Sequence, residues 1–316
     1  MPTPHMCPPA LLERDLRHHR AIVTGANSGI GLVTATQLAK QGAAVTLACR
    51  RVEEAERCAS EIRATHAGAQ VEARALDLGD LASVRGFASS FLADHDKLSL
   101  LINNAGVMNT PRGKTKDGFE TQIGVNHLGH FLLTSLLLDR LKQSAPARVV
   151  NVSSCFHDRA QGREGKIVLD DLHFERRAYD GWEAYAQSKL ANVLHAKALA
   201  KRLEGAGVTA VSVHPGWVRT RLIRHSLPLW VQDILMRPFM GLIGMIEPWE
   251  GAQTTLYAAL ADDVEHQSGA FYSQFGIYRD KAAKGGGWPM RSPNPHAHDE
   301  ALADALWDKS AELVGA

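Results

Sequence analysis

The chain has 316 residues with 45% hydrophobic content, which is enough for one large core or two modest ones. Its 35 basic and 34 acidic side chains leave a formal net charge of +1, so nothing indicates nucleic acid or an anionic surface as the main partner. The four cysteines form no CxxC pair, which argues against a zinc site or a disulfide framework and favours a reducing compartment.

The N-terminus does not resemble a secretion signal, because prolines and charges stand where a signal peptide needs an apolar run. The longest apolar region, 227–249, is interrupted by Asp233, Arg237, Pro238 and Glu247, whereas a membrane-spanning helix needs about 20 residues with few charges. We therefore expect a cytoplasmic protein in which this region is buried or amphipathic. Association with a membrane surface stays open.

Short apolar runs rich in Val, Ile and Leu alternate along the chain with longer segments of helical pattern. The runs predict six strands and a possible seventh, at residues 20–25, 43–50, 69–78, 98–104, 147–154, 207–216 and 268–274. The helical segments lie at 32–42, 52–66, 124–143 and 299–313. Two more are expected, one after the third strand and running through Phe91, and one that carries Tyr185 and Lys189. The stretch 281–298 has no such pattern and is expected to be an irregular surface loop.

Continuous apolar strands spaced by helices imply a parallel sheet that is covered on both faces. Right-handed crossovers then give a doubly wound α/β fold. We therefore expect a single Rossmann-type domain over residues 20–316, behind an N-terminal extension at residues 1–19. Its parallel sheet should have about seven strands, with helices on both faces.

The first expected strand ends in "TGANSGIG", residues 24–31. Glycine lets the backbone turn sharply and leaves room for a pyrophosphate against the N-terminus of the next helix, where unpaired N–H groups point outward. A P-loop would need Lys and then Ser or Thr after the last glycine, where Leu32 stands, and a nucleophile elbow would need G-x-S-x-G. Because the motif lies directly between a strand and a helix, it favours a dinucleotide site over a glycine-rich turn without a ligand. The residues expected to contact the cofactor here are Gly25, Asn27, Ser28, Gly29, Ile30 and Gly31.

The end of the second strand indicates which dinucleotide is bound, because this position contacts the adenosine ribose in such folds. An acidic residue there would bond the ribose hydroxyls of NAD, whereas a basic one accepts the 2′-phosphate of NADP. The strand ends in "LACRRVEE", so Arg50 and Arg51 come before the first acid, Glu53. Arginine's planar fork suits phosphate, so the sequence predicts NADP(H) in preference to NAD(H), although Arg51 could simply face water. Asp77 and Leu78, at the end of the third strand, are placed to touch the adenine.

Polar motifs follow the next strands at the same edge of the sheet, where an open parallel sheet binds its ligands. They are "NNAG" at 103–106, "VNVSS" at 150–154 and "HPGWVRT" at 214–220. Tyr185 and Lys189 stand four residues apart in "AYAQSKLAN", so on a helix a phenol and an ammonium would share one face. By itself the pair could be a solvated surface feature. Beside a nicotinamide it could be an acid that is tuned by a positive charge.

Together these motifs resemble the short-chain dehydrogenase/reductase family. "TGANSGIG", "NNAG", Asn126, Ser154 and "YAQSK" are similar, in the family's order, to its glycine motif, its structural NNAG motif and its Asn-Ser-Tyr-Lys tetrad. "HPGWVRT" resembles the segment that holds the nicotinamide amide. The resemblance covers the chain from Arg20 to about Tyr272 and is closest to the retinol dehydrogenase branch, which "LINNAGVM", "GVNHLGHFLLT" and "SKLAN" resemble.

The resemblance implies hydride transfer between a nicotinamide and a carbonyl/alcohol pair, with the protein supplying orientation and a proton. Tyr185 would exchange that proton, and a charged Lys189 should lower the pKa of its phenol, because a nearby positive charge favours the phenolate. Ser154 would bind the substrate oxygen, with Ser153 as the alternative, and Asn126 would kink its helix and help to hold a water linked to the lysine. The cofactor contacts that the resemblance adds are Asn104, Ala105, Gly106, Tyr185, Lys189, Pro215, Gly216, Val218 and Thr220.

Ser154 and Tyr185 are 31 positions apart, more than in many members of the family, and this insertion puts the substrate in doubt more than the chemistry. Trp, Met and Phe side chains cluster between 229 and 249, within the region 217–249 where the family builds its substrate lid. They could be plain core, but an apolar substrate pocket is favoured. The expected substrate is therefore a hydrophobic molecule of retinoid, steroid or lipid-aldehyde type.

Two other functions stay open. A catalytically silent NADP-binding sensor would need no acid, so the presence of Asn126, Ser154, Tyr185 and Lys189 argues against it. An epimerase or dehydratase of the related extended family would share the Tyr-x-x-x-Lys pair. Such enzymes usually have a TGxxGxxG spacing and recycle NAD, which this glycine spacing and Arg50 argue against.

Two further features concern metals and subunits. His127 and His130 stand three apart on an expected helix, but no third ligand has a suitable spacing, so packing or surface histidines are favoured over a metal site. In the family, the helices after the fourth and fifth strands often pair between subunits. Their counterparts here are apolar enough for a homodimer.

Overall fold

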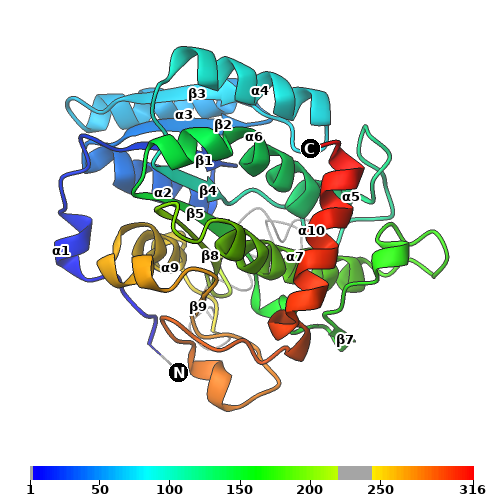
Figure 1. Cartoon of the computed structure of the whole chain (residues 1–316). Coiled ribbons are helices and arrows are strands. Elements are labelled where there is room, and N and C mark those ends of the chain that lie inside the picture. The colour runs from blue at the N-terminus through cyan, green and yellow to red at the C-terminus, as the bar shows by residue number, and fades with distance from the viewer. Residues whose placement is uncertain (1–2, 220–243) are drawn as a thin grey trace, which may run out of the picture.

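The computed structural model describes residues 3–219 and 244–316 (Figure 1). Within these residues, seven parallel strands form one sheet in the order β3-β2-β1-β4-β5-β8-β9, which runs from β3 near the top of Figure 1 to β9 near the bottom. The strands are β1 (Arg20–Thr24), β2 (Ala44–Cys49), β3 (Val71–Ala75), β4 (Leu100–Asn103), β5 (Ala147–Val152), β8 (Val208–His214) and β9 (Phe271–Ser273). This arrangement confirms the expected doubly wound Rossmann-type fold, including its seventh strand.

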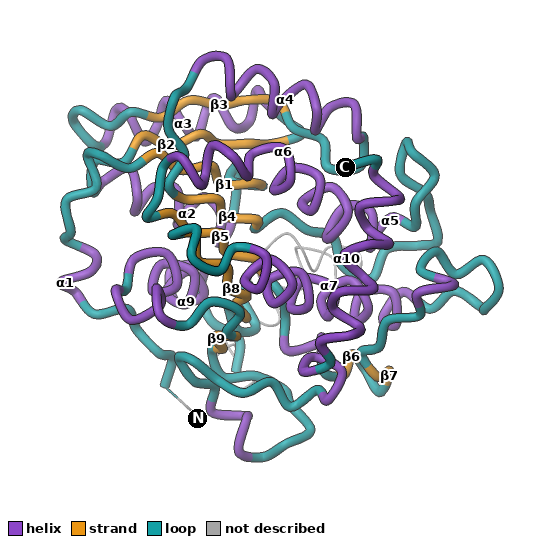
Figure 2. The backbone as a smooth tube through the Cα atoms, in the orientation of Figure 1, coloured by secondary structure: helices purple, strands orange, loops and turns teal. Residues whose placement is uncertain are grey.

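Helices cover both faces of the sheet (Figure 2). One face packs against α2, α3 and α9, and the other against α4, α6 and α7, with α10 lying along α7. The helices are α1 (Pro9–Leu12), α2 (Gly29–Lys40), α3 (Val52–Thr65), α4 (Leu81–Asp94), α5 (Thr121–Ile123), α6 (Gly129–Gln143), α7 (Gly181–Arg202), α9 (Pro248–Leu260) and α10 (Glu300–Val314). Successive side chains of a strand point to opposite faces of the sheet, so one strand contributes to the apolar clusters on both faces. In β1, Ala21 and Val23 belong to one apolar cluster, and Ile22 between them belongs to the other.

The N-terminal extension packs onto the same core as the domain that follows it. Cys7 and Leu16 are buried in the apolar cluster that α2 and α9 share with the sheet. Arg14 donates to the Leu260 carbonyl oxygen at 2.8 Å, at the end of α9, and forms an ion pair with Asp262 at 2.8 Å. Residues 3–19 therefore enlarge the core instead of forming a separate arm.

The long connection between β5 and α7 holds a short antiparallel ribbon of β6 (Arg159–Ala160) and β7 (Arg163–Glu164). The segment 281–298 packs against this connection. Asn294 is buried and donates through Nδ2 to the carbonyl oxygens of His157 at 2.6 Å and Gly165 at 2.8 Å. The expectation of a surface loop at 281–298 is therefore wrong for its second half, because polar side chains there satisfy inward-facing carbonyls.

Candidate active site

The glycine-rich turn links the end of β1 to the first turn of α2. Gly25 and Gly29 have φ angles of +65° and +57°, in the left-handed region that glycine adopts most readily. A Cβ at Gly31 would lie 2.4 Å from Asn104 Nδ2, so a larger residue does not fit. Ser28 occupies the N-cap position of α2, and its side chain makes no capping hydrogen bond. The first N–H groups of α2 and the Ser28 hydroxyl therefore stand where a dinucleotide phosphate would bind.

The motif at 103–106 braces this turn from the neighbouring strand β4. Thr24, the last residue of β1, accepts hydrogen bonds through Oγ1 from the N–H groups of Asn104 and Ala105, both at 2.9 Å. Asn104 donates through Nδ2 to the Thr24 carbonyl oxygen at 2.7 Å, and a Cβ at Gly25 would lie 3.0 Å from Ala105. These expected cofactor residues thus lie side by side where β1 and β4 are neighbours and the strand order reverses.

The two arginines after β2 have different surroundings. Arg51 forms an ion pair with Glu54 at 2.9 Å, and Glu54 also accepts a hydrogen bond from the Asn27 amide at 3.0 Å. Arg50 is exposed and forms no ion pair with any residue that the structure describes. Arg50 is therefore the arginine with a guanidinium group available for a phosphate, whereas Arg51 is already paired with Glu54 of α3.

Asp77 and Leu78 lie two and three residues beyond the end of β3, in the turn before α4. Asp77 accepts a hydrogen bond from the Gly79 N–H at 2.9 Å, and Leu78 is buried. The strand is thus shorter than expected. Both residues still stand at its carboxyl end, the position from which an adenine contact is expected.

Asn126 lies in a π-helical turn, Gly124–Leu128, that interrupts the run from α5 to α6. Such turns frequently occur at functional sites. The side-chain amide of Asn126 is fully used: Oδ1 accepts from the Val107 N–H at 2.8 Å, and Nδ2 donates to the Val107 carbonyl oxygen and to Ser188 Oγ, each at 2.9 Å. Asn126 therefore ties the segment after β4 to α7, the helix of the tyrosine–lysine pair.

Tyr185 and Lys189 lie on one face of α7, and both are buried. The Lys189 Nζ is 5.8 Å from the centre of the Tyr185 ring and donates to the Val152 carbonyl oxygen, at the end of β5, at 3.0 Å. A Cβ at Gly106 would lie 3.4 Å from that amine and 3.1 Å from Asn126 Oδ1. The pair therefore faces the carboxyl edge of the sheet and is not a solvated surface feature.

Burial dominates the titration of both groups. It raises the pKa of the Tyr185 phenol above its ordinary value, and a hydrogen bond with Ser154 offsets this only in part. It lowers the pKa of Lys189 to about 8. The pKa of the phenol therefore rises instead of falling toward neutral pH as expected, because removal from water disfavours the buried phenolate more than the neighbouring groups favour it.

The two serines after β5 have separate hydrogen bonds. Ser153 Oγ donates to the Lys189 carbonyl oxygen at 2.7 Å. Ser154 Oγ accepts from the Phe156 N–H at 3.2 Å, and the hydrogen bond that it shares with Tyr185 lowers the pKa of the phenol. Ser154, and not Ser153, is therefore the serine beside the phenol.

The segment after β8 lies next to the start of α2. Pro215 precedes Gly216, which has a φ of +93°, and a Cβ at Gly216 would lie 2.8 Å from Ile246 Cδ1. Val218 pairs with Ile246 in an isolated parallel bridge, and Ile30 of α2 packs against the same pair. The segment that is expected to hold the nicotinamide amide thus adjoins the glycine-rich turn.

The expected lid, 217–249, is described only at its two ends, and Thr220 lies outside the described residues. These ends meet through main-chain hydrogen bonds. The Ile246 N–H donates to the Trp217 carbonyl oxygen at 2.9 Å, and the Arg219 N–H donates to the Ile246 carbonyl oxygen at 3.0 Å.

Apolar side chains surround the Tyr185 ring. The cluster consists of Met108, Phe156, Trp182, Trp217 and Met245. Phe156 meets Tyr185 and Trp182 edge to face, with ring centres 6.1 and 5.6 Å apart. Trp217 and Met245 lie in the region expected to form the lid, whereas sequence reasoning missed Met108, Phe156 and Trp182, because these come from separate segments and share no motif. A molecule bound at the phenol would therefore meet a mainly apolar wall.

His127 and His130 are both buried, and each meets a hydroxyl group. His127 Nε2 lies 2.8 Å from Ser310 Oγ, and His130 Nε2 lies 2.8 Å from Thr24 Oγ1. Burial lowers the pKa of His127 to about 3 and that of His130 to about 4. Across residues 3–219 and 244–316, no group of three or more His, Cys, Asp or Glu side chains could hold a metal ion.

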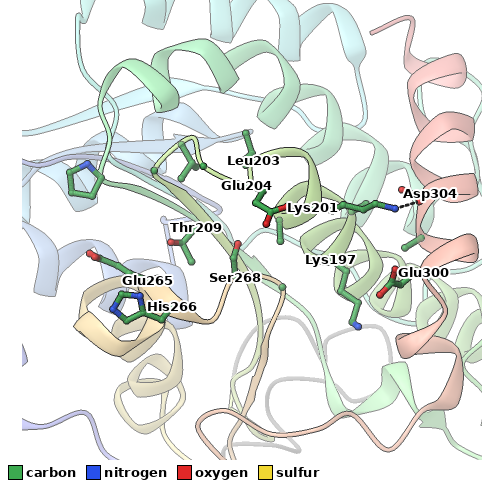
Figure 3. A pocket seen from close by; sticks show the side chains of 18 residues that line it. Lys197, Lys201, Leu203, Glu204, Thr209, Glu265, His266, Ser268, Glu300 and Asp304 are labelled. Atoms are coloured by element: carbon green, nitrogen blue, oxygen red, sulfur yellow. Dashed lines mark hydrogen bonds and ion pairs between the residues drawn. The ribbon is translucent and has the colours of Figure 1, made fainter.

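A separate hollow of about 800 Å³ lies at the amino end of β8, beside the C-terminal half of α7 (Figure 3). Its wall mixes charges of both signs, including the ion pair of Lys201 with Asp304 at 2.8 Å. Tyr185 stands near the other end of α7, at the carboxyl edge of the sheet, where open parallel sheets bind ligands. This hollow is therefore not part of the candidate active site.

The fold and this site define a class of protein, and comparison with known proteins agrees. Residues 19–228 match the model of the short chain dehydrogenase family, so the chain belongs to the short-chain dehydrogenase/reductase family of oxidoreductases and is retinol dehydrogenase-like. It is 50% identical over 294 residues to human retinol dehydrogenase 12, a match that covers 93% of this chain and 85% of that protein. It is 44% identical over 296 residues to human retinol dehydrogenase 13, covering 93% and 84%.

Solved structures of similar fold support a nicotinamide cofactor. An uncharacterised protein from Mycobacterium paratuberculosis is 36% identical with a TM-score of 0.75, over 99% of this chain and 98% of that one. A 3-ketoacyl-(acyl-carrier-protein) reductase from Brucella melitensis complexed with NADH is 25% identical with a TM-score of 0.62, over 81% and 96%. A Pseudomonas aeruginosa protein in an NADP complex is 25% identical with a TM-score of 0.63, over 82% and 96%. The neighbours thus include complexes of both dinucleotides.

Within the described part of the chain, every helix is too short or too polar to traverse a membrane.

Proposed function

We propose that the chain is an NADP(H)-dependent oxidoreductase that moves a hydride between the nicotinamide and a carbonyl or alcohol carbon of a hydrophobic, retinoid-like substrate. The observation that carries this proposal is the buried pair of Tyr185 and Lys189 on one face of α7, directed to the carboxyl edge of the sheet beside an apolar wall. The identity with human retinol dehydrogenase 12 supports the retinoid class.

The described residues fit a dinucleotide. At Gly25 and Gly31 the turn packs so closely against Asn104 and Ala105 that a Cβ does not fit, and α2 begins at this turn with its first N–H groups available to a phosphate. Lys189 and Gly106 adjoin at the other end of this edge, where the lysine would hold the nicotinamide ribose. The guanidinium group of Arg50, which has no ion-pair partner within residues 3–219 and 244–316, favours the 2′-phosphate of NADP over the bare ribose of NAD.

Tyr185 is the proton donor and acceptor in this proposal. When bound, the nicotinamide supplies the hydride for reduction of a carbonyl carbon and accepts it in the reverse direction. Burial keeps the Tyr185 phenol protonated at neutral pH, so its proton is available to the carbonyl oxygen as the hydride adds to carbon. Ser154, which shares a hydrogen bond with the phenol, orients the same oxygen.

Lys189 and Asn126 support this proton transfer. Lys189, with a pKa of about 8, is charged at neutral pH and stabilises the phenolate that remains once the proton has left. Asn126 holds the segment after β4 against α7, and so fixes the position of the expected cofactor residues after β4 relative to Tyr185 and Lys189 on α7.

The apolar wall indicates the substrate class. Phe156, Trp182 and Met108 present aromatic and thioether surface next to the phenol. Pockets of this composition bind the apolar body of a ligand and leave a few polar groups to orient it. A long polyene or a fused-ring molecule with one oxygen at its end would place its apolar body against this wall and its oxygen at the phenol.

The proposal is tested with hydrophobic aldehydes and ketones and the corresponding alcohols, each assayed with NADP(H) and NAD(H) in parallel by nicotinamide absorbance. Turnover of retinoid-type substrates with NADP(H) is expected. Tyr185→Phe should lower kcat by about 10²- to 10⁴-fold, far more than it changes the dissociation constant of NADPH. Binding of NADPH without turnover would instead indicate a silent sensor, and substrate conversion without net consumption of NADPH would indicate an epimerase or dehydratase.

A further inference from the structure

We propose that His157 and Ser292 together position Ser154, so that the C-terminal segment 288–298 sets the efficiency of proton transfer at Tyr185. The inference rests on the proposed function, in which Ser154 orients the substrate oxygen. It assigns a positioning role to two residues that touch neither the phenol nor the cofactor turn.

The ring of His157 connects the serine loop to the C-terminal segment. His157 Nδ1 lies 2.6 Å from the Ser154 carbonyl oxygen, and His157 Nε2 lies 2.6 Å from Ser292 Oγ. A carbonyl oxygen only accepts, so Nδ1 carries the hydrogen. The ring is neutral at pH 7, because burial lowers the pKa of His157 to about 4. Nε2 must therefore accept the hydrogen of the Ser292 hydroxyl, and the direction of both bonds is fixed.

Ser292 is itself held in place by its own segment. Its Oγ accepts from the Asn294 N–H at 3.2 Å, and its carbonyl oxygen accepts from His298 Nε2 at 2.8 Å. Asn294 also donates to the His157 carbonyl oxygen at 2.6 Å. The C-terminal segment thus contacts both the ring and the main chain of His157. Phe271 packs edge to face on the same ring, with the ring centres 4.8 Å apart.

The bond from the ring acts on the part of Ser154 that controls its hydroxyl group. Ser154 precedes a short 3-10 turn, and its carbonyl oxygen accepts from the His157 N–H at 3.0 Å as well as from the ring. The Cα of Ser154 carries both this peptide group and the hydroxymethyl group, so fixing one restrains the other. Loss of the ring contact leaves the serine loop with fewer restraints beside the phenol.

Ser292→Ala removes the hydrogen that Nε2 accepts and alters no residue of the site. We expect kcat for aldehyde reduction to fall about tenfold, since small misplacements of reacting groups are costly. The dissociation constant of NADPH, measured by fluorescence titration, should not change. The control is Ser310→Ala, which removes another buried serine–histidine contact, between Ser310 Oγ and His127 Nε2 at 2.8 Å. It should lower the melting temperature comparably and leave kcat unchanged.

The background Ser154→Ala shows whether the effect passes through Ser154. In that background Ser292→Ala should change kcat no further, because the Ser154 hydroxyl through which it acts is absent. His157→Asn keeps a donor near the position of Nδ1 and loses Nε2, so it should reproduce the Ser292→Ala effect and replaces that variant if it fails to fold.

Three results would overturn the inference. Full kcat in Ser292→Ala, or an undiminished effect of Ser292→Ala in the Ser154→Ala background, would exclude the positioning role while leaving the proposed function intact. Full activity of Ser154→Ala alone would remove the role of Ser154 in the proposed function, and the positioning role with it.

Discussion

The hydroxyl group of Thr24, at the end of β1, lies 2.8 Å from Nε2 of His130 on α6. Nδ1 of the same ring lies 3.1 Å from the Asn126 carbonyl oxygen, which only accepts, so Nε2 accepts the hydrogen of the hydroxyl. The oxygen of Thr24 is then free to accept from the N–H groups of Asn104 and Ala105, both at 2.9 Å. One small side chain thus joins the glycine-rich turn, the motif after β4 and the π-helical turn.

Thr24→Val should destabilise the protein markedly. The substitution keeps the shape and leaves the Ala105 N–H and one ring nitrogen without their partner beside the fully buried Thr24 side chain, whereas the Asn104 N–H keeps its bond to the Ile102 carbonyl oxygen at 3.0 Å. An unpaired buried group costs about 1–3 kcal/mol, so we expect a loss of at least about 2 kcal/mol in urea unfolding followed by tryptophan fluorescence. Thr24→Ser keeps the hydroxyl and should lose only about 1 kcal/mol for its missing methyl group. Equal losses for the two variants would show that the hydrogen bonds contribute little.

Gly31→Ala should weaken dinucleotide binding. The added Cβ would lie 2.4 Å from Asn104 Nδ2 and 2.7 Å from the Gly25 carbonyl oxygen, so the turn must open. Overpacking of this kind costs about 1–3 kcal/mol, which corresponds to roughly 5- to 150-fold in the dissociation constant of NADPH. The matched control is Gly86→Ala on α4, where a Cβ meets nothing within 4 Å. It should leave binding unchanged and stabilise the helix by about 0.5–1 kcal/mol. Unchanged binding in Gly31→Ala would contradict a phosphate site at this turn.

Arg50→Ser should reduce the preference for NADP(H). A charge-assisted hydrogen bond contributes about 1.5–3 kcal/mol, so KM for NADPH should rise by roughly 10- to 150-fold while KM for NADH stays the same. Arg51→Ser should have a smaller effect, because Arg51 is already paired with Glu54 at 2.9 Å. A larger effect of Arg51→Ser would assign the phosphate to Arg51.

The sheet could be read from the sequence because its strands are buried on both faces and appear as continuous apolar runs. The segment 281–298 could not. Ser292 and Asn294 meet His157 across 135 and 137 positions of the chain, so no local pattern announces that these polar side chains are buried. Local composition predicts surface residues here, but hydrogen bonds to a distant part of the chain bury these side chains.

In the candidate site, too, the local motifs could be predicted from the sequence and the long-range contacts could not. The glycine-rich turn and the pair of Tyr185 and Lys189 are contiguous motifs, and the structure places both at the carboxyl edge of the sheet. The apolar wall around the phenol is assembled from separate segments and has no motif. The pKa of Tyr185 was expected to fall, but it rises, because burial is a property of the whole fold and outweighs the local pairing.

Lys189 makes the stability of the protein depend on pH in a defined direction. Burial lowers its pKa from 10.5 to about 8, so between these values the unfolded chain holds a proton that the folded chain has released. Stability rises with pH wherever the unfolded state binds more protons, here by up to about 1.4 kcal/mol per pH unit from this group. Buried thiols act in the opposite sense, because the pKa of Cys49 and of Cys155 is raised to about 11.

The contribution of Lys189 is therefore isolated as a difference between two proteins. The unfolding free energy of wild type minus that of Lys189→Met should increase steadily from about pH 8 to about pH 10 in urea titrations, since only wild type has the buried amine. Lys201→Met, on the same helix, is the matched control. Asp304 raises the pKa of Lys201, so its contribution is constant below 10.5 and its difference from wild type should be flat. A flat difference for Lys189→Met as well would mean that the folded protein keeps this amine charged, and that it lies in wetter surroundings than the contact with Val152 implies.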